Sequence, residues 1–101
     1  MSFVTAERTL FALAPDGGEH EVVLRVFSPT LQPGGEWGGM VSLGTLQSRP
    51  YLICGVDAQQ ATELGMQFIA LRIGHFVTDG WQFYGERGGH VTSASELWPA
   101  T

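Results

Sequence analysis

The sequence predicts a single α+β domain, in which an antiparallel meander of about four strands carries one long helix packed on one face. Residues 3–56 contain several runs that alternate apolar and polar side chains with a period near two, which is typical of half-buried strands. From residue 58 onward, apolar residues recur at helical spacing. The 101 residues, of which 44% are hydrophobic and 15% charged, suffice for one core and leave no room for a second.

The first two strands are expected to form an antiparallel hairpin. Residues 3–13 and 19–27 both alternate, and the segment between them contains Pro-Asp-Gly-Gly at 15–18. Proline presets the φ angle of a turn and glycine accepts a positive φ, so this segment predicts a tight reversal of the chain.

Two further strands are predicted over residues 40–46 and 51–56, with a short turn at 47–50. The preceding segment, 28–39, is rich in proline and glycine around Trp37 and is expected to be a connection. Because residues 51–54 are apolar at every position, this run predicts a central strand that the helix covers on one side.

The helix is expected to begin after Asp57, a good N-cap, and Gln60 three residues later completes a pattern that resembles a capping box. It is expected to end or bend between Gly74 and Gly80. Gly65 on the buried face is expected to let the helix approach the sheet closely. The predicted apolar face comprises Ala58, Ala61, Leu64, Gly65, Phe68 and Phe76.

Beyond the helix the pattern is weaker. Residues 81–84 are expected to form either a last short strand or an aromatic cover over one end of the core. Residues 85–92 are rich in glycine, and residues 93–101 are expected to form an irregular tail anchored by Leu97 and Trp98.

The segment 55–61, Gly-Val-Asp-Ala-Gln-Gln-Ala, resembles a strand-to-helix motif, G-V-D-x-x-Q-A, in a family of uncharacterised bacterial proteins of about 100 residues. The resemblance covers roughly residues 51–76 and implies a small sheet-plus-helix fold with a glycine-rich, aromatic C-terminal segment. It implies no activity and no catalytic residue. The motif also has a structural interpretation, in which Gly55 permits a sharp exit from the strand, Asp57 caps the helix and Ala61 lets its first turn rest on the sheet.

Charge and composition argue against several functional classes. The net charge is −5, all five cations are arginines spread along the chain, and the basic stripe of a nucleic-acid-binding protein is missing. The apolar stretch 64–77 is interrupted by polar residues and falls short of the ~20 apolar residues of a membrane span. The first nine residues do not form a secretory signal, and one cysteine fits a reducing compartment, so a cytoplasmic location is expected.

The sequence does not predict a catalytic site, a metal site or a cofactor. Zinc-type spacings of histidine and cysteine are missing, and the glycine-rich loops lack the Gly-Lys-Ser/Thr ending of a phosphate-binding loop. Cys54 lies within an apolar strand, where a buried, inert thiol is the favoured interpretation. Asp57 is best explained as a helix cap. A non-enzymatic role is therefore favoured.

Two sets of residues are candidates for binding. Arg72 falls at an apolar helical angle, and with Tyr84 and His90 it would supply the polar groups of a small-molecule pocket, although a packed stem with a solvated head is the simpler explanation. Exposed tryptophans near loops are candidates for contact with a protein partner, since Trp, Tyr and Arg dominate interface hot spots. These are Trp37, Trp81 and Trp98.

The favoured functional hypothesis is a small cytoplasmic protein-binding module of the immunity or accessory type. Its acidity would suit a more basic partner, and pairing of a free strand edge could equally give a homodimer. The alternative is a small-molecule-binding protein or minor enzyme that uses a pocket near Arg72, Tyr84 and His90.

Overall fold

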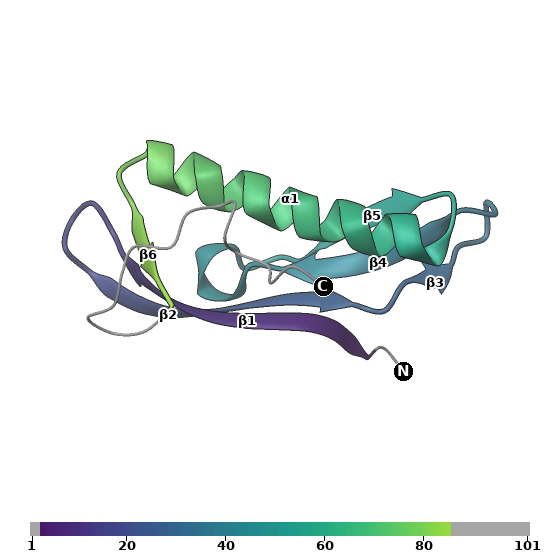
Figure 1. Cartoon of the computed structure of the whole chain (residues 1–101), viewed down its shortest axis with the longest axis horizontal. Coiled ribbons are helices and arrows are strands. Elements are labelled where there is room, and N and C mark those ends of the chain that lie inside the picture. Colours follow the sequence, from purple (N-terminus) through teal and green to yellow (C-terminus); the bar gives the residue numbers. More distant parts are fainter. Residues whose placement is uncertain (1–2, 86–101) are drawn as a thin grey trace.

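The computed structural model describes residues 3–85. Within this range a six-stranded antiparallel sheet carries one long helix on one face (Figure 1). The predicted α+β class and the single long helix are confirmed, whereas a count of about four strands was too low. The elements are β1 (Val4–Leu13), β2 (Glu19–Phe27), β3 (Thr30–Leu31), β4 (Trp37–Ser42), the 3₁₀ turn η1 (Gly44–Leu46), β5 (Tyr51–Gly55), α1 (Ala58–Thr78) and β6 (Gln82–Tyr84).

The strands β1, β2, β4 and β5 form the predicted meander, each pairing antiparallel with the next. The short β3 pairs with the beginning of β4, and β6 pairs with β1 at the other side of the sheet. The helix therefore leaves the sheet at β5 and returns the chain to the side of β1 (Figure 1). This crossing places the helix on one face of the sheet, mainly over β4 and β5.

The hairpin of β1 and β2 confirms the prediction from the alternating pattern. Its strands pair from Leu13 opposite Glu19 to Val4 opposite Phe27, with one irregularity between Val4 and Ala6. In the turn, Gly17 has a φ of 92° and the Asp16 carboxylate accepts a hydrogen bond of 2.8 Å from the backbone of Gly18. The aspartate and the glycine that predict a turn in the sequence thus form its side-chain hydrogen bond and its positive φ in the structure.

The segment after the hairpin differs from the prediction. Residues 28–39 were expected to be a connection, but they contain β3 and the first residues of β4. The third strand also ends earlier than expected, because Gly44 adopts a φ of 59° and starts η1. A Cβ at Gly44 would lie 2.8 Å from the Val23 carbonyl oxygen, so only glycine lets the chain turn this close to β2.

The prediction that the run 51–54 forms a central strand is wrong. Among the described residues β5 pairs only with β4, so it lies at an edge of the sheet. The prediction that the helix covers one face of this strand is confirmed. There the ring centroid of Tyr51 lies 4.7 Å from that of Phe68. On the other face Leu52 is 51% exposed. Cys54 is accordingly half-buried rather than buried.

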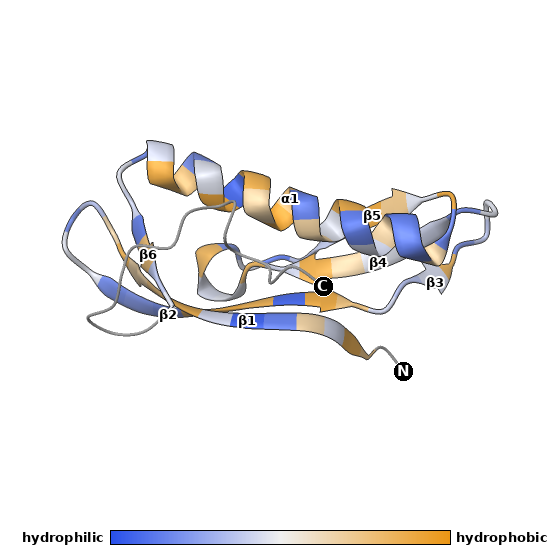
Figure 2. Ribbon diagram, in the orientation of Figure 1, coloured by the Kyte–Doolittle hydropathy of each residue, from blue (hydrophilic) through white to orange (hydrophobic). Residues whose placement is uncertain are grey.

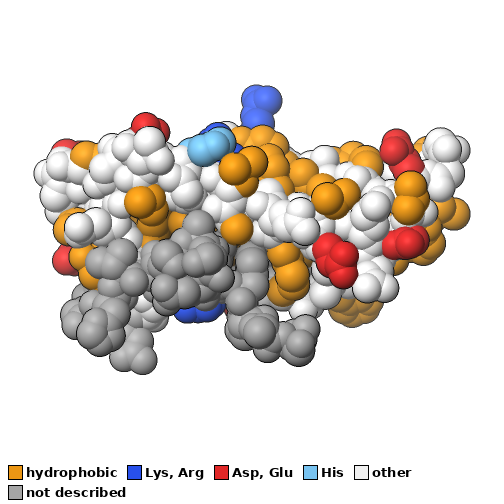
Figure 3. Space-filling model, turned by 45° about the horizontal axis from the view of Figure 1, so that its top comes forward, with side chains coloured by type: hydrophobic (Ala, Val, Ile, Leu, Met, Phe, Trp, Pro, Cys, Tyr) orange, Lys and Arg blue, Asp and Glu red, His pale blue; other side chains and the backbone are white. Residues whose placement is uncertain are grey.

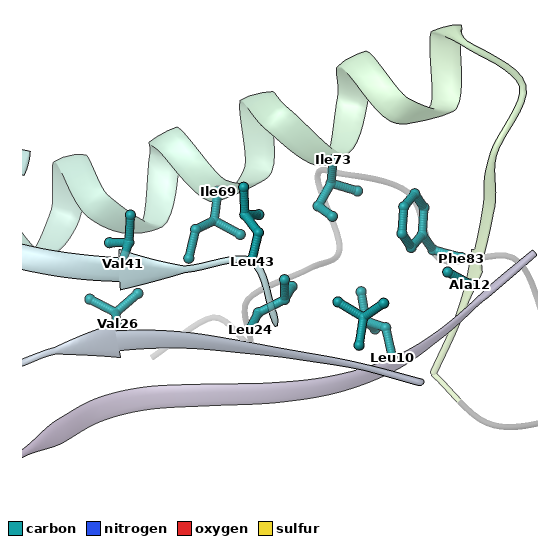
Figure 4. Close-up of a cluster of buried hydrophobic side chains, with 10 residues drawn as sticks. Leu10, Ala12, Leu24, Val26, Val41, Leu43, Ile69, Ile73 and Phe83 are labelled. Carbon is teal, nitrogen blue, oxygen red and sulfur yellow. The ribbon is translucent and has the colours of Figure 1, made fainter. Parts of the chain in front are cut away.

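The core lies between the helix and the sheet (Figure 4). It takes alternate residues of β1 and β2, the end of β4 and one row of α1, and Figure 2 shows this row as apolar patches on the side of α1 that faces the sheet. At Gly65 an added Cβ would lie 2.9 Å from Cγ1 of Val41, which confirms the predicted close approach. The buried cluster is Leu10, Ala12, Val22, Leu24, Val26, Val41, Leu43, Ile69, Ile73 and Phe83.

The predicted apolar face of the helix was only partly right. Ala61 and Gly65 are buried as expected, but the other two buried positions are Ile69 and Ile73, and Leu64 is 37% exposed. The four buried residues recur every four positions, a row that drifts around a straight helix by about 40° per step. The sheet is twisted, and the row that follows it leaves Leu64 at the margin.

Candidate binding surface

The residues of the strand-to-helix junction have structural roles. A Cβ at Gly55 would lie 2.7 Å from the backbone nitrogen of Ala61, so the strand end and the first helical turn are in direct contact. The Asp57 carboxylate accepts a hydrogen bond of 2.7 Å from the backbone N–H of Gln60. In return, the Gln60 side chain accepts one of 2.8 Å from the N–H of Val56. Packing and capping thus account for the residue types of this motif.

Two of the three candidate pocket residues, Arg72 and Tyr84, are not brought together. Tyr84 lies opposite Phe11 in the β1–β6 pairing, next to Phe83, which is buried beneath the helix. Successive residues of a strand point to opposite faces, so the Tyr84 side chain lies on the face away from the helix, where its hydroxyl donates to Gln82 at 2.8 Å. Arg72 is on the helix. His90 lies outside the described residues.

The environment of Arg72 is mainly aromatic. Its guanidinium carbon lies 5.7 Å from the centroid of the Phe76 ring, a cation–π contact between residues four apart on the helix. Its Nε is buried and has no hydrogen-bond partner among residues 3–85. The side chain is half-buried overall, as expected for a packed stem with a solvated head.

The two candidate tryptophans that can be placed lie near opposite ends of the helix. Trp81 covers the core at the C-terminal end of the helix. Its ring centroid lies 5.5 Å from that of Phe76, 5.5 Å from that of His20 and 6.3 Å from that of Phe83. Trp37 pairs with Gly55 near the helix N-terminus. A helix of 21 residues spans about 31 Å, so these two side chains do not share one patch. Trp98 lies outside the described residues.

The residues 81–84, predicted as a strand or as an aromatic cover, serve as both. Gln82–Tyr84 forms β6, whose Phe83 is buried, and Trp81 packs against the core beside it. Both tryptophans are half-buried, and each therefore has a structural role as well as an exposed part.

The outer edge of β5 is the most distinctive feature of the surface. It has no strand partner among the described residues, and its five residues, Tyr-Leu-Ile-Cys-Gly, carry no charge and no proline. Natural edge strands are usually protected by charges, proline, bulges or a very short length. In contrast, the strand at the other side of the sheet, β6, is only three residues long.

An apolar row of the helix lies on the side of this edge. Phe68 contacts Tyr51 of β5, and Leu64 and Leu71, four residues before and three after it, lie on the same side of the helix. Leu71 is 58% exposed and Leu64 is 37% exposed. Figure 3 shows apolar side chains exposed on the face that carries the helix, with a histidine and arginine atoms beside them. We call the outer edge of β5 together with Leu64, Phe68 and Leu71 the β5–α1 surface.

Charged residues lie at the two ends of this surface. The exposed Arg49 comes two residues before β5, and the exposed Asp57 comes two residues after it. Clusters of three or more histidine, cysteine or acidic side chains that could hold a metal ion do not occur in the described range. This surface offers backbone hydrogen bonding and apolar contact, with the Arg72 guanidinium one helical turn beyond Phe68.

The β5–α1 surface was not predicted from the sequence, in which aromatic residues near loops were the candidates for binding. The signal that could have found it is the same apolar run, 51–54, that was interpreted as a central strand. No helix of the described residues is long and apolar enough to cross a membrane. In comparisons with known proteins, no family model, no curated protein and no solved structure matches this chain.

Proposed function

We propose that this protein is a non-catalytic protein-binding module, and that the β5–α1 surface is where its partner binds. The observation that supports the proposal is an uncharged edge strand that has no strand partner among residues 3–85 and lies next to exposed apolar side chains of the helix. Addition of a strand to such an edge is a recurrent mode of protein recognition, in which main-chain hydrogen bonds supply affinity and alternate side chains supply specificity.

The side chains around the edge fit this mode of binding. On the face away from the helix, Leu52 covers Gly38, whose added Cβ would lie 2.9 Å from the Leu52 side chain. On the helix side, Ile53 and Phe68 pack against the core, which holds both side chains in place. A partner strand would therefore meet apolar contacts on both faces while it hydrogen-bonds to β5.

An immunity or accessory role belongs to this proposal. The net charge of −5 would suit a basic partner over the rest of the surface. A small-molecule site at Arg72, Tyr84 and His90 is not proposed, because Arg72 and Tyr84 lie on opposite sides of the sheet.

The test is a pair of leucine-to-lysine variants. Leu52→Lys places a charge on the β5 edge, as natural proteins do to block strand addition. Leu31→Lys is the matched control, because Leu31 is 62% exposed but lies on β3, across β4 from β5. The protein and both variants would be purified gently from the native host, and their complexes would be compared by native mass spectrometry.

We expect a protein complex that is lost in Leu52→Lys and retained in Leu31→Lys. Both variants should unfold within about 0.5 kcal/mol of the parent, since both side chains are more than half exposed. If the complex survives Leu52→Lys, the partner binds elsewhere and the assignment of the surface is wrong.

A further inference from the structure

We infer that the partner at the β5–α1 surface is a second copy of this chain, with the two β5 strands paired antiparallel across a two-fold axis. This inference rests on the proposed function and names the partner of the same surface. The dimer would join the two sheets edge to edge into one continuous sheet, with both helices on the same face. Three properties of the surface support self-pairing over pairing with an unrelated strand.

The first property is the register that the side-chain faces allow. Tyr51 and Ile53 point to the helix side, because Tyr51 pairs with the buried Val41, whereas Leu52 and Cys54 point away. A two-fold axis perpendicular to the sheet keeps like faces together, so residues of one face must lie opposite residues of the same face. The register that places Ile53 opposite itself satisfies this condition and aligns all five residues.

The second property is the charge at the ends of the strand. Arg49 lies before β5 and Asp57 lies after it, and both are exposed. Antiparallel pairing of two copies places the basic end of each strand beside the acidic end of the other, twice in one interface. Two chains of net charge −5 thus meet at a place where their local charges attract.

The third property is the apolar row of the helix. Phe68 lies over Tyr51 and the first helical turn lies against Gly55, so in this register Phe68 of one copy lies nearest the start of the partner helix. Leu64, between these two positions, lies nearest the axis and so nearest its own copy. An isologous contact needs a patch that complements itself, and an apolar leucine close to the axis does so. Burial of Leu64, now 37% exposed, would add apolar area to the strand pairing.

The mass in solution gives the first test. Sedimentation velocity over about 1 to 100 µM should show a shift from the 10.9 kDa chain to twice that mass as concentration rises. Leu52→Lys should weaken the association at least tenfold, and Leu31→Lys should leave it unchanged within a factor of about two. A monomer at every concentration would overturn the inference.

Disulfide trapping tests the register. In the register centred on Ile53, position 52 lies opposite Cys54 of the other copy, within the Cα separation that a disulfide spans. Leu52→Cys should therefore form a covalent dimer on mild oxidation, whereas Leu52→Cys combined with Cys54→Ser should not. A dimer that forms equally in the double variant would place residue 52 opposite itself and would contradict the proposed register.

The outcomes separate this inference from the proposed function. A monomeric protein that still captures another protein through the β5 edge, with loss in Leu52→Lys, overturns the homodimer and leaves the binding module standing. A monomeric protein with no protein complex sensitive to Leu52→Lys overturns both.

Discussion

The helix carries two apolar rows, and only one of them is used by the fold. Ala61, Gly65, Ile69 and Ile73 are buried against the sheet. On the side of β5, Leu64 and Leu71 are exposed and only Phe68 packs partly on the core. Both rows lie on the same helix, yet only the first one is buried in the core.

The difference indicates what the second row is for. Singly exposed apolar side chains are common on protein surfaces, but Leu64 and Leu71 border an unprotected strand edge. The first row should therefore respond to mutation through stability, and the second through association. The predictions that follow separate these two effects.

The largest expected effect is on the buried row. Ile69→Ala removes a fully buried side chain and should lower the free energy of unfolding by about 2–5 kcal/mol. Leu71→Ala on the exposed row should change it by less than about 0.5 kcal/mol. Urea denaturation of both variants measures the difference, and similar losses in the two would erase the distinction between the rows.

A second effect concerns the close contact of helix and sheet. Gly65→Ala introduces a Cβ 2.9 Å from Cγ1 of Val41 and should cost about 1–3 kcal/mol. In a Val41→Ala background the same substitution should cost less, because the clashing methyl is gone and alanine favours the helix by about 1 kcal/mol. Additive effects in this double-mutant cycle would show that the two positions do not touch.

A smaller effect is expected at the helix cap. Asp57→Ala removes the acceptor of the Gln60 N–H and should lower the free energy of unfolding by about 1 kcal/mol. Asp79→Ala is the control at the other end of the helix, where a negative charge opposes the helix dipole, and it should not destabilise. Thermal unfolding of the two variants side by side checks this prediction, and an equal loss at Asp79 would contradict a capping role.

The smallest expected effect on stability is on the exposed row. Leu64→Gln should change the free energy of unfolding by less than about 0.5 kcal/mol, since the side chain already contacts solvent. It should nevertheless weaken self-association severalfold in sedimentation experiments. A variant that lowers stability and leaves association intact would assign this row to the core.

Much of the fold could be predicted from local patterns. The hairpin follows from alternation and from the Pro-Asp-Gly-Gly turn, and the helix start follows from Asp57 and Gln60. These features depend on interactions between residues close in sequence, and turn and capping preferences describe such interactions well. The short strands β3 and β6 have two and three residues, and their pairing depends on distant partners that no local pattern reveals.

The position of β5 could not be predicted for a different reason. A run that is apolar on both faces is typical of a central strand, but an edge strand that is buried in an interface has the same pattern. The failure to predict the edge is therefore consistent with the proposed association. The separation of Arg72 and Tyr84, in contrast, follows from strand alternation once Phe83 is known to be buried.

Hydrogen exchange at different protein concentrations tests the central claim most directly. If β5 pairs with a second copy, the amides of residues 51–55 should exchange more slowly as concentration rises, while those of the β1–β2 hairpin should not change. The Leu52→Lys variant should lose this dependence. Exchange in β5 that is the same at every concentration in the parent protein would contradict the account.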